Sequence, residues 1–120
     1  MSVNQATLHG WSGIPSQEMA PGVSRQFLTA SRVTIGRFHL ARGAVIPAHA
    51  HENEQVSCVL TGALNFRLGE REVVVRAGQV LEIPSWVEHG VTVLEEADVL
   101  DVFCPVRQDW IDGTDAYFRR

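Results

Sequence analysis

The sequence lacks the features that mark exported, membrane-spanning or nucleic-acid-binding proteins. No apolar run approaches the ~20 residues needed to cross a bilayer. The first 22 residues carry neither the basic start nor the apolar stretch of a signal peptide. The net charge of -4 and the isoelectric point near 5.7 speak against a nucleic-acid partner, which usually needs a basic face. We therefore expect a soluble, cytoplasmic protein with no membrane or nucleic-acid partner.

Cysteine is also scarce, with only Cys58 and Cys104 in 120 residues. Neither forms a CxxC pair, so a thiolate zinc site is not expected, and without an export signal both thiols should stay reduced. The sequence has no internal repeat, no low-complexity segment and no amphipathic helix of ordinary length. The length suits one domain with a core of its own.

What the sequence does contain is a succession of short apolar runs separated by turn residues. This pattern predicts an all-β sandwich or barrel over residues 25–107. We expect residues 1–24 to form an irregular arm that packs on the barrel or a partner through Trp11 and Ile14. The tail, 108–120, should form a short helix or an arm over a neighbouring subunit. The predicted strands are 25–28, 33–40, 55–60, 64–68, 72–76, 80–83, 91–94 and 99–104, with turns that include 61–62 and 95–97.

A cluster of potential metal ligands follows from the spacing of three residues. His49 and His51 are two apart and Gln55 lies four further on, so in an extended segment all three point to one face. His89 follows the predicted end of a later strand, and imidazole is the commonest protein ligand of first-row divalent metals. A bulge near Asn53 would bring in Glu54 instead of Gln55. His9 and His39 are interpreted as ordinary core or surface residues.

Two segments resemble the motifs of the cupin superfamily. They are Gly43-x5-His49-x-His51-x3-Gln55-x6-Gly62 and Gly78-x5-Pro84-x-Trp86-x2-His89. The resemblance implies a jelly-roll barrel, the cupin double-stranded β-helix, with one divalent metal (zinc, nickel, iron or manganese) on His49, His51, Gln55 and His89. It also implies a homodimer, since small cupins are commonly dimers.

Three residues depart from the family pattern. Gln55 stands where cupins usually have Glu, Trp86 where they often have Gly, and Val93 where they often have Asn. Four neutral ligands would leave the metal's double charge uncompensated, making it a stronger Lewis acid that attracts anions. They also lack the carboxylate of the iron-oxygenase triad. Trp86 is interpreted either as shaping the pocket mouth or as capping the barrel.

The run 99–107 contains the other candidate site residues. Asp101 lies in an apolar strand, where a carboxylate must be exposed, paired or functional. Arg107 is open to three interpretations: a partner of Asp101, an anion-binding group or a solvated side chain. Arg25, Asn65, Arg67 and Glu82 are best interpreted as solvated surface.

With Leu94-Glu95-Glu96 and Asp109-Trp110, this run is similar to the KdgF-type cupins of pectin and alginate breakdown, which open 4,5-unsaturated monouronates to linear keto-uronates. The resemblance implies catalytic or substrate-contacting roles for Asp101, Phe103 and Arg107, and a small anionic substrate. The alternatives are a cupin dioxygenase for a flavonol- or diketone-like substrate, a polyketide cyclase and a non-catalytic small-molecule-binding module.

Overall fold

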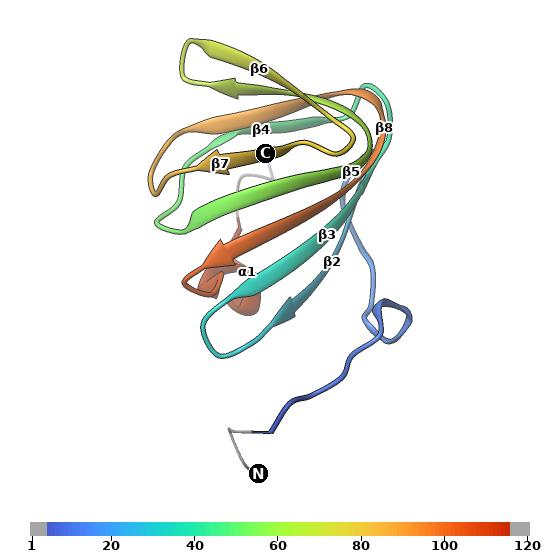
Figure 1. Ribbon diagram of the computed structural model, residues 1–120, viewed down its shortest axis with the longest axis vertical. Coiled ribbons are helices and arrows are strands. Elements are labelled where there is room, and N and C mark those ends of the chain that lie inside the picture. The colour runs from blue at the N-terminus through green and yellow to red at the C-terminus, as the bar shows by residue number, and fades with distance from the viewer. Residues whose placement is uncertain (1–4, 116–120) are drawn as a thin grey trace.

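The strands form one antiparallel sheet that curls into a jelly-roll barrel, as the sequence predicts. The computed structural model describes residues 5–115 (Figure 1). None of the helices in these residues is long and apolar enough to cross a membrane. The elements are η1 (Trp11–Gly13), β1 (Gln17–Ala20), β2 (Val23–Thr29), β3 (Thr34–Leu40), β4 (Val45–His49), β5 (Glu54–Leu68), β6 (Arg71–Arg76), β7 (Val80–Ile83), β8 (His89–Cys104) and α1 (Gln108–Asp112).

Alternation of apolar and polar residues explains which face of each strand is buried. In β3, Thr34, Gly36, Phe38 and Leu40 are buried and the residues between them are not. The period of two follows from the pleat, which sends successive side chains to opposite faces. In β8 the odd-numbered residues 97–103 face inward in the same way, which places Asp101 and Phe103 inside the barrel.

The two longest strands correct the sequence prediction, which divided each of them in two. Residues 61–62 and 95–97 are not turns, because β5 and β8 run through them as paired strands with bulges. The bulge in β5 switches its inward face from odd positions, such as Val59, to even positions, such as Leu64. Gly62 has φ +84°, and a Cβ there would overlap the carbonyl oxygen of Glu96. Glycine is therefore required where the two bends meet.

These bends let each long strand contribute to two parts of the barrel. The first half of β5 pairs with β7 and with the end of β8, whereas its second half pairs with β6 and the start of β8. The start of β8 also pairs with β4, which carries His49 at its end. As a result, β4, β5 and β8 bring the predicted metal ligands to one place.

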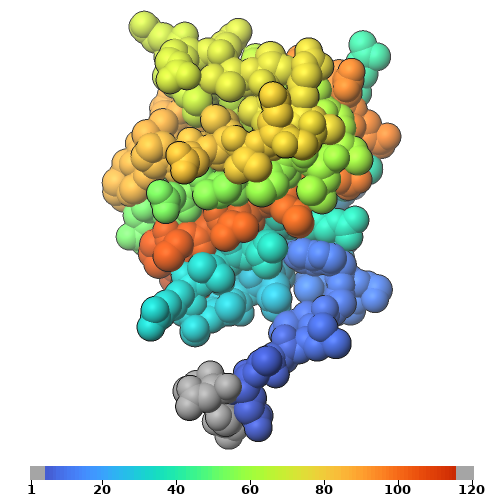
Figure 2. Space-filling view, viewed as in Figure 1, coloured from blue at the N-terminus to red at the C-terminus, as the bar shows by residue number. Residues whose placement is uncertain are grey.

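The N-terminal segment contains more regular structure than predicted, since β1 and the first residues of β2 fall within 1–24. Its attachment involves the main chain rather than a buried side chain. The Gln26 amide donates hydrogen bonds to the carbonyl oxygens of Trp11 and Ile14, both 2.8 Å long. Residues 5–10 extend away from the barrel, shown in blue in Figure 2.

The C-terminal segment closes over the barrel through Trp110 of α1. Its indole is buried edge-on against Phe27, Phe38 and Phe103. Gly36 makes room for it, because a Cβ there would lie 3.0 Å from the ring. Arg25 also stacks on this indole and pairs with Asp115 at 2.8 Å. Arg25 is 3% exposed, so its interpretation as solvated surface was wrong.

Candidate metal centre

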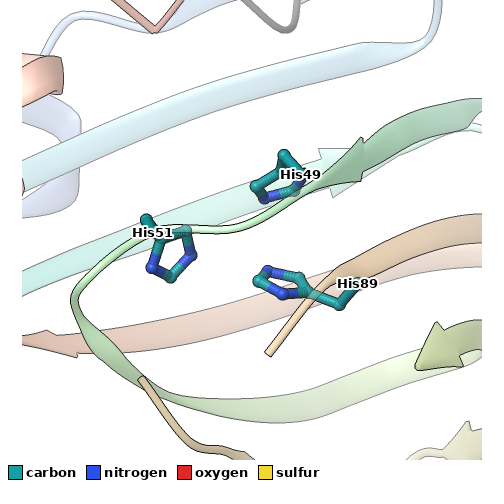
Figure 3. A group of neighbouring side chains, drawn as sticks. All are labelled: His49, His51 and His89. Carbon is teal, nitrogen blue, oxygen red and sulfur yellow. The ribbon is translucent and has the colours of Figure 1, made fainter. Parts of the chain in front are cut away.

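Three histidines from two distant segments meet at one end of the barrel (Figure 3). His49 ends β4, His51 follows it, and His89 begins β8, with His49 and His89 paired across the ladder. One nitrogen from each ring lies within 4.8 Å of the others. The ring centroids are 4.3 Å apart for His49 and His89 and 5.0 Å apart for His51 and His89.

Main-chain carbonyl groups fix the orientation of all three rings. Nδ1 of His49 lies 2.8 Å from the Pro47 oxygen, that of His51 3.1 Å from the Asn53 oxygen, and that of His89 2.9 Å from the Val87 oxygen. A carbonyl oxygen only accepts, so Nδ1 carries the hydrogen in His49 and His89, and these neutral rings have their lone pair on Nε2. His51 faces an acceptor oxygen at each nitrogen, and the tautomer it would share with the other two rings donates Nδ1–H to Asn53. Outer hydrogen bonds of this kind orient histidine ligands in metal sites.

Gln55 adds a fourth acceptor to the cluster. Its side-chain oxygen lies 3.1 Å from Nε2 of His51, while its amide nitrogen donates to Ser57 Oγ at 2.9 Å. Gln55 is 5% exposed, and Glu54 is exposed. The β5 register therefore places Gln55 inside the barrel and Glu54 outside. With the His51 hydrogen on Nδ1, Nε2 of His51 and the Gln55 oxygen are both acceptors, and together with Nε2 of His49 and His89 they make a set of four that fits a divalent cation.

Burial keeps the histidines neutral, the form in which they bind metals. Desolvation, together with the nearby His89, lowers the pKa of His49 to about 3. Desolvation and the charge of Arg107 lower the pKa of His51 to about 4. The pKa of His89 is lowered, chiefly by desolvation. At neutral pH no proton competes with a cation for these nitrogens.

Asp101 is buried in the same cavity and connected to the cluster through Ser57. Ser57 has one hydroxyl hydrogen, and since its oxygen accepts from Gln55, that hydrogen is available to the Asp101 carboxylate. Asp101 Oδ1 has no partner within residues 5–115. Desolvation raises the pKa of Asp101 to about 6, against the opposing effects of Ser57 and Arg107. Asp101 is thus not a solvent-facing residue.

Arg107 is buried beside this cavity and held by Asp109. It is 1% exposed, so it is not a solvated side chain. Nε and Nη2 donate to the two Asp109 oxygens at 2.9 and 2.7 Å. Burial opposes ionisation of Asp109, but the Arg107 hydrogen bonds and charge outweigh it and lower the pKa of Asp109. The guanidinium also stacks on Phe103 and Trp110, at 4.7 and 4.4 Å.

The cavity enclosed by these residues has a volume of about 30 Å³. Phe103 forms part of its wall and lies edge-on to His51, with ring centroids 5.7 Å apart. Most of the lining is apolar, and its charged or polar members are His49, Gln55, His89, Asp101 and Arg107. Asn65 is half-buried, and Arg67 and Glu82 are exposed; none of the three lines the cavity.

Sequence reasoning missed several supporting residues. Ser57 shares the inward parity of Gln55, which was a usable signal. Asn53, by contrast, is recognisable only in three dimensions, because its buried amide donates to the oxygens of Pro105 and Val106. These bonds connect the loop that carries His51 to the segment that carries Arg107.

Comparisons with known proteins agree with this fold. The family model described as a cupin domain matches residues 36–103. The pectin degradation protein KdgF of Dickeya dadantii (strain 3937) is 29% identical over 100 residues, which cover 81% of this chain and 91% of that protein. KdgF from Halomonas sp. has a similar structure, with a TM-score of 0.75 and 28% identity over 80% of this chain and 92% of that one.

A further solved structure supports the fold alone. An RmlC-like cupin from Shewanella frigidimarina NCIMB 400 superposes with a TM-score of 0.81 at 24% identity, over 88% of this chain and 96% of the other. The two proteins therefore share this fold over most of both chains.

Proposed function

The chain belongs to the cupin family, and we propose that it is a metal-dependent enzyme that opens the ring of a 4,5-unsaturated uronate to a linear keto-uronate. The observation that carries this proposal is the placement of a buried carboxylate, Asp101, and a buried guanidinium, Arg107, around one cavity with the histidine cluster. The chemistry needs a cation for the substrate carboxylate and a group that moves a proton. Both are present beside the candidate metal ligands.

The proposed metal ligands are His49, His51, His89 and the Gln55 oxygen. A divalent ion held by them would act as a Lewis acid, polarising an oxygen of the substrate. Arg107 contributes fixed positive charge beside these ligands, where it would favour the substrate carboxylate. Asp109 keeps the guanidinium in place through its two hydrogen bonds. The zinc, nickel, iron and manganese alternatives all suit this ligand set to some degree.

Asp101 is the proposed acid and base. In the reaction the hemiacetal hydroxyl loses its proton, the ring carbon–oxygen bond breaks, and the released enol becomes a ketone by moving a proton from oxygen to carbon. A carboxyl group with a pKa of about 6 is suited to both accepting and returning that proton near neutral pH. Ser57 orients one side of the carboxylate and leaves Oδ1 for the substrate. Phe103 provides an apolar wall that keeps water from the reacting atoms.

The test is turnover of unsaturated galacturonate, followed by loss of its ultraviolet absorbance above the spontaneous rate. The protein is loaded in turn with zinc, nickel, iron and manganese. The proposal predicts acceleration with at least one metal, and its loss in His49→Ala, Asp101→Asn and Arg107→Gln. Arg67→Ala is the matched control, because Arg67 is an exposed arginine outside the cavity. Metal-loaded protein that gives no acceleration with any metal would contradict the proposal.

A second candidate is favoured by one specific observation, the largely apolar lining of the cavity. An oxygenase that acts on a diketone- or flavonol-like substrate would suit such a wall. Oxygen consumption with these substrates distinguishes the two candidates, since the uronate reaction uses no oxygen.

The proposal also includes assembly as a homodimer. The N-terminal segment extends from the barrel and leaves Leu8 exposed, which a second copy would cover (Figure 2). Sedimentation of the wild type and Leu8→Asp tests this, because the dimer should dissociate in the variant. A monomeric wild type would contradict it.

A further inference from the structure

The turn that precedes His89 contains a residue that its backbone conformation disfavours. Val87 N–H donates to the Pro84 oxygen at 3.2 Å, closing a four-residue turn, and Trp86 at its third position has φ +65°. Turns of this form call for glycine there, because a Cβ is strained at positive φ. Trp86 is the one non-glycine residue with positive φ among residues 5–115. A bulky side chain thus occupies a position where glycine would be easier to accommodate.

Packing does not explain this tryptophan, since its side chain is 67% exposed. Its backbone, however, is fixed to the metal centre, because Trp86 N–H donates to the His51 oxygen at 2.8 Å. Figure 1 shows the connection between β7 and β8 at the same end of the barrel as the connection between β4 and β5. Backbone strain that no side-chain packing offsets is typical of functional positions.

The small volume of the inner cavity bears on the function of Trp86. About 30 Å³ is room for one or two water molecules, whereas pockets for small molecules usually measure roughly 300–1,000 Å³. A monosaccharide acid could therefore bring its carboxylate end to the histidines and Arg107, but most of its ring would stay at the entrance. The connections that carry His51 and Trp86 lie at the same end of the barrel, so groups on them are candidates to contact that ring.

We propose that Trp86 is a substrate-contacting residue that stacks its indole on the ring of the uronate at the entrance to the metal centre. This inference rests on the proposed function for the identity of the ligand. The flat indole presents a large apolar surface to the carbon–hydrogen face of a sugar ring. Its contribution is to binding rather than to the proton transfers, which remain with Asp101.

Three substitutions separate the ring contact from the backbone strain. Trp86→Gly removes both the indole and the strain, Trp86→Ala removes the indole and keeps the strain, and Trp86→Phe keeps an aromatic ring. Val80→Ala is the control, since Val80 is an exposed apolar residue on the neighbouring β7. The metal-loaded proteins are compared by calorimetric binding of galacturonate, by KM and kcat for unsaturated galacturonate, by thermal midpoint and by sedimentation.

We expect the Gly and Ala variants to weaken galacturonate binding and raise KM about tenfold, equivalent to about 1.4 kcal/mol, with kcat within twofold. Trp86→Phe should stay within about threefold of the wild type, and Trp86→Gly should melt above Trp86→Ala. The inference is overturned if all variants bind galacturonate like the wild type, if the wild type does not bind it, or if only the oligomeric state changes. Turnover by the wild type with the same KM in all variants would overturn this inference and leave the proposed function standing. Galacturonate binding that depends on Trp86, without any turnover, would overturn the proposed function and leave the contact through Trp86 standing.

Discussion

The side-chain oxygen of Gln55 lies 3.1 Å from Nε2 of His51, and the Asn53 oxygen lies at the same distance from Nδ1 of that ring. A neutral ring has one hydrogen for these two oxygens, so with the hydrogen on Nδ1 the Gln55 oxygen and Nε2 are both acceptors. The Gln55 oxygen faces the ring because its amide nitrogen is used by Ser57. Two acceptors held this close repel each other unless a cation binds both.

Gln55→Glu should tighten binding of divalent metals by about tenfold or more, because a carboxylate replaces a neutral amide beside the cation. The same added negative charge should make the bound metal a weaker Lewis acid and lower kcat. Competition titration against a chelator measures the affinity. Glu54→Gln, at the adjacent exposed position, is the control and should leave it unchanged. Equal metal affinity in Gln55→Glu and the wild type would show that residue 55 is not a ligand.

Ser57→Ala should weaken metal binding by about tenfold, as substitutions of residues that hydrogen-bond to a metal ligand commonly do. The Gln55 amide loses the acceptor that holds it, and Asp101 loses a hydrogen bond that favours its charged form. The pKa of Asp101 should therefore rise further, shifting the acidic limb of the kcat profile to higher pH. Cys58→Ala is the control, because Cys58 occupies the next position on the outer face of β5. An unchanged affinity and pH profile would refute the connection.

Asp101→Asn should stabilise the metal-free protein at pH 8 by about 3 kcal/mol and have little effect at pH 4. The pKa of Asp101 is raised to about 6 in the folded chain from an ordinary 3.8, so the folded state binds its proton more tightly. Stability of the wild type therefore falls as pH rises from about 4 to 6, and the amide removes this loss.

Urea unfolding from pH 4 to pH 8 in the presence of a chelator measures the difference. Glu70→Gln, in an exposed turn, is the matched control for the loss of one carboxylate. A gain from Asp101→Asn that is the same at every pH would contradict the assignment of a raised pKa to this residue.

Gly36→Val should destabilise the fold by about 2 kcal/mol, because even a Cβ at this position lies 3.0 Å from the Trp110 ring. Displaced Trp110 would also disturb Arg107, which stacks on it, so KM should rise along with the loss of stability. Denaturant unfolding and near-ultraviolet circular dichroism report the two effects. Gly13→Val, where no atom lies within 4 Å of the added Cβ, should leave both unchanged. A Gly36→Val protein with a native Trp110 signal would contradict this packing.

The sequence was sufficient to predict an all-β domain and the inward parity of Gln55 from the pattern of its strands, and the jelly-roll barrel from the resemblance of two segments to the cupin motifs. It was insufficient for the two bulges. Thr61-Gly62 has the composition of a turn, and only the neighbouring strand, which supplies the Glu96 oxygen, shows that the chain continues as a strand. Local propensity and long-range pairing conflict at this point, and pairing prevails.

The surroundings of Arg107 could not be predicted from the sequence for a similar reason. Its burial depends on Trp110 folding back over the barrel and on Gly36 making room for it, residues 74 apart in the chain. An arginine after a strand is usually solvated, so the local pattern favoured the wrong environment. The same holds for Arg25, whose partner Asp115 lies 90 residues away.

Counting bound ions shows whether Gln55 and the three histidines bind a divalent metal. Chains purified without metal are equilibrated with zinc, nickel, iron or manganese, dialysed, and analysed for metal per chain. We expect one bound ion per chain for the wild type. In His51→Ala and His89→Ala the metal affinity should fall by about a hundredfold or more. Absence of bound metal in the wild type, or equal binding by both variants, would contradict it.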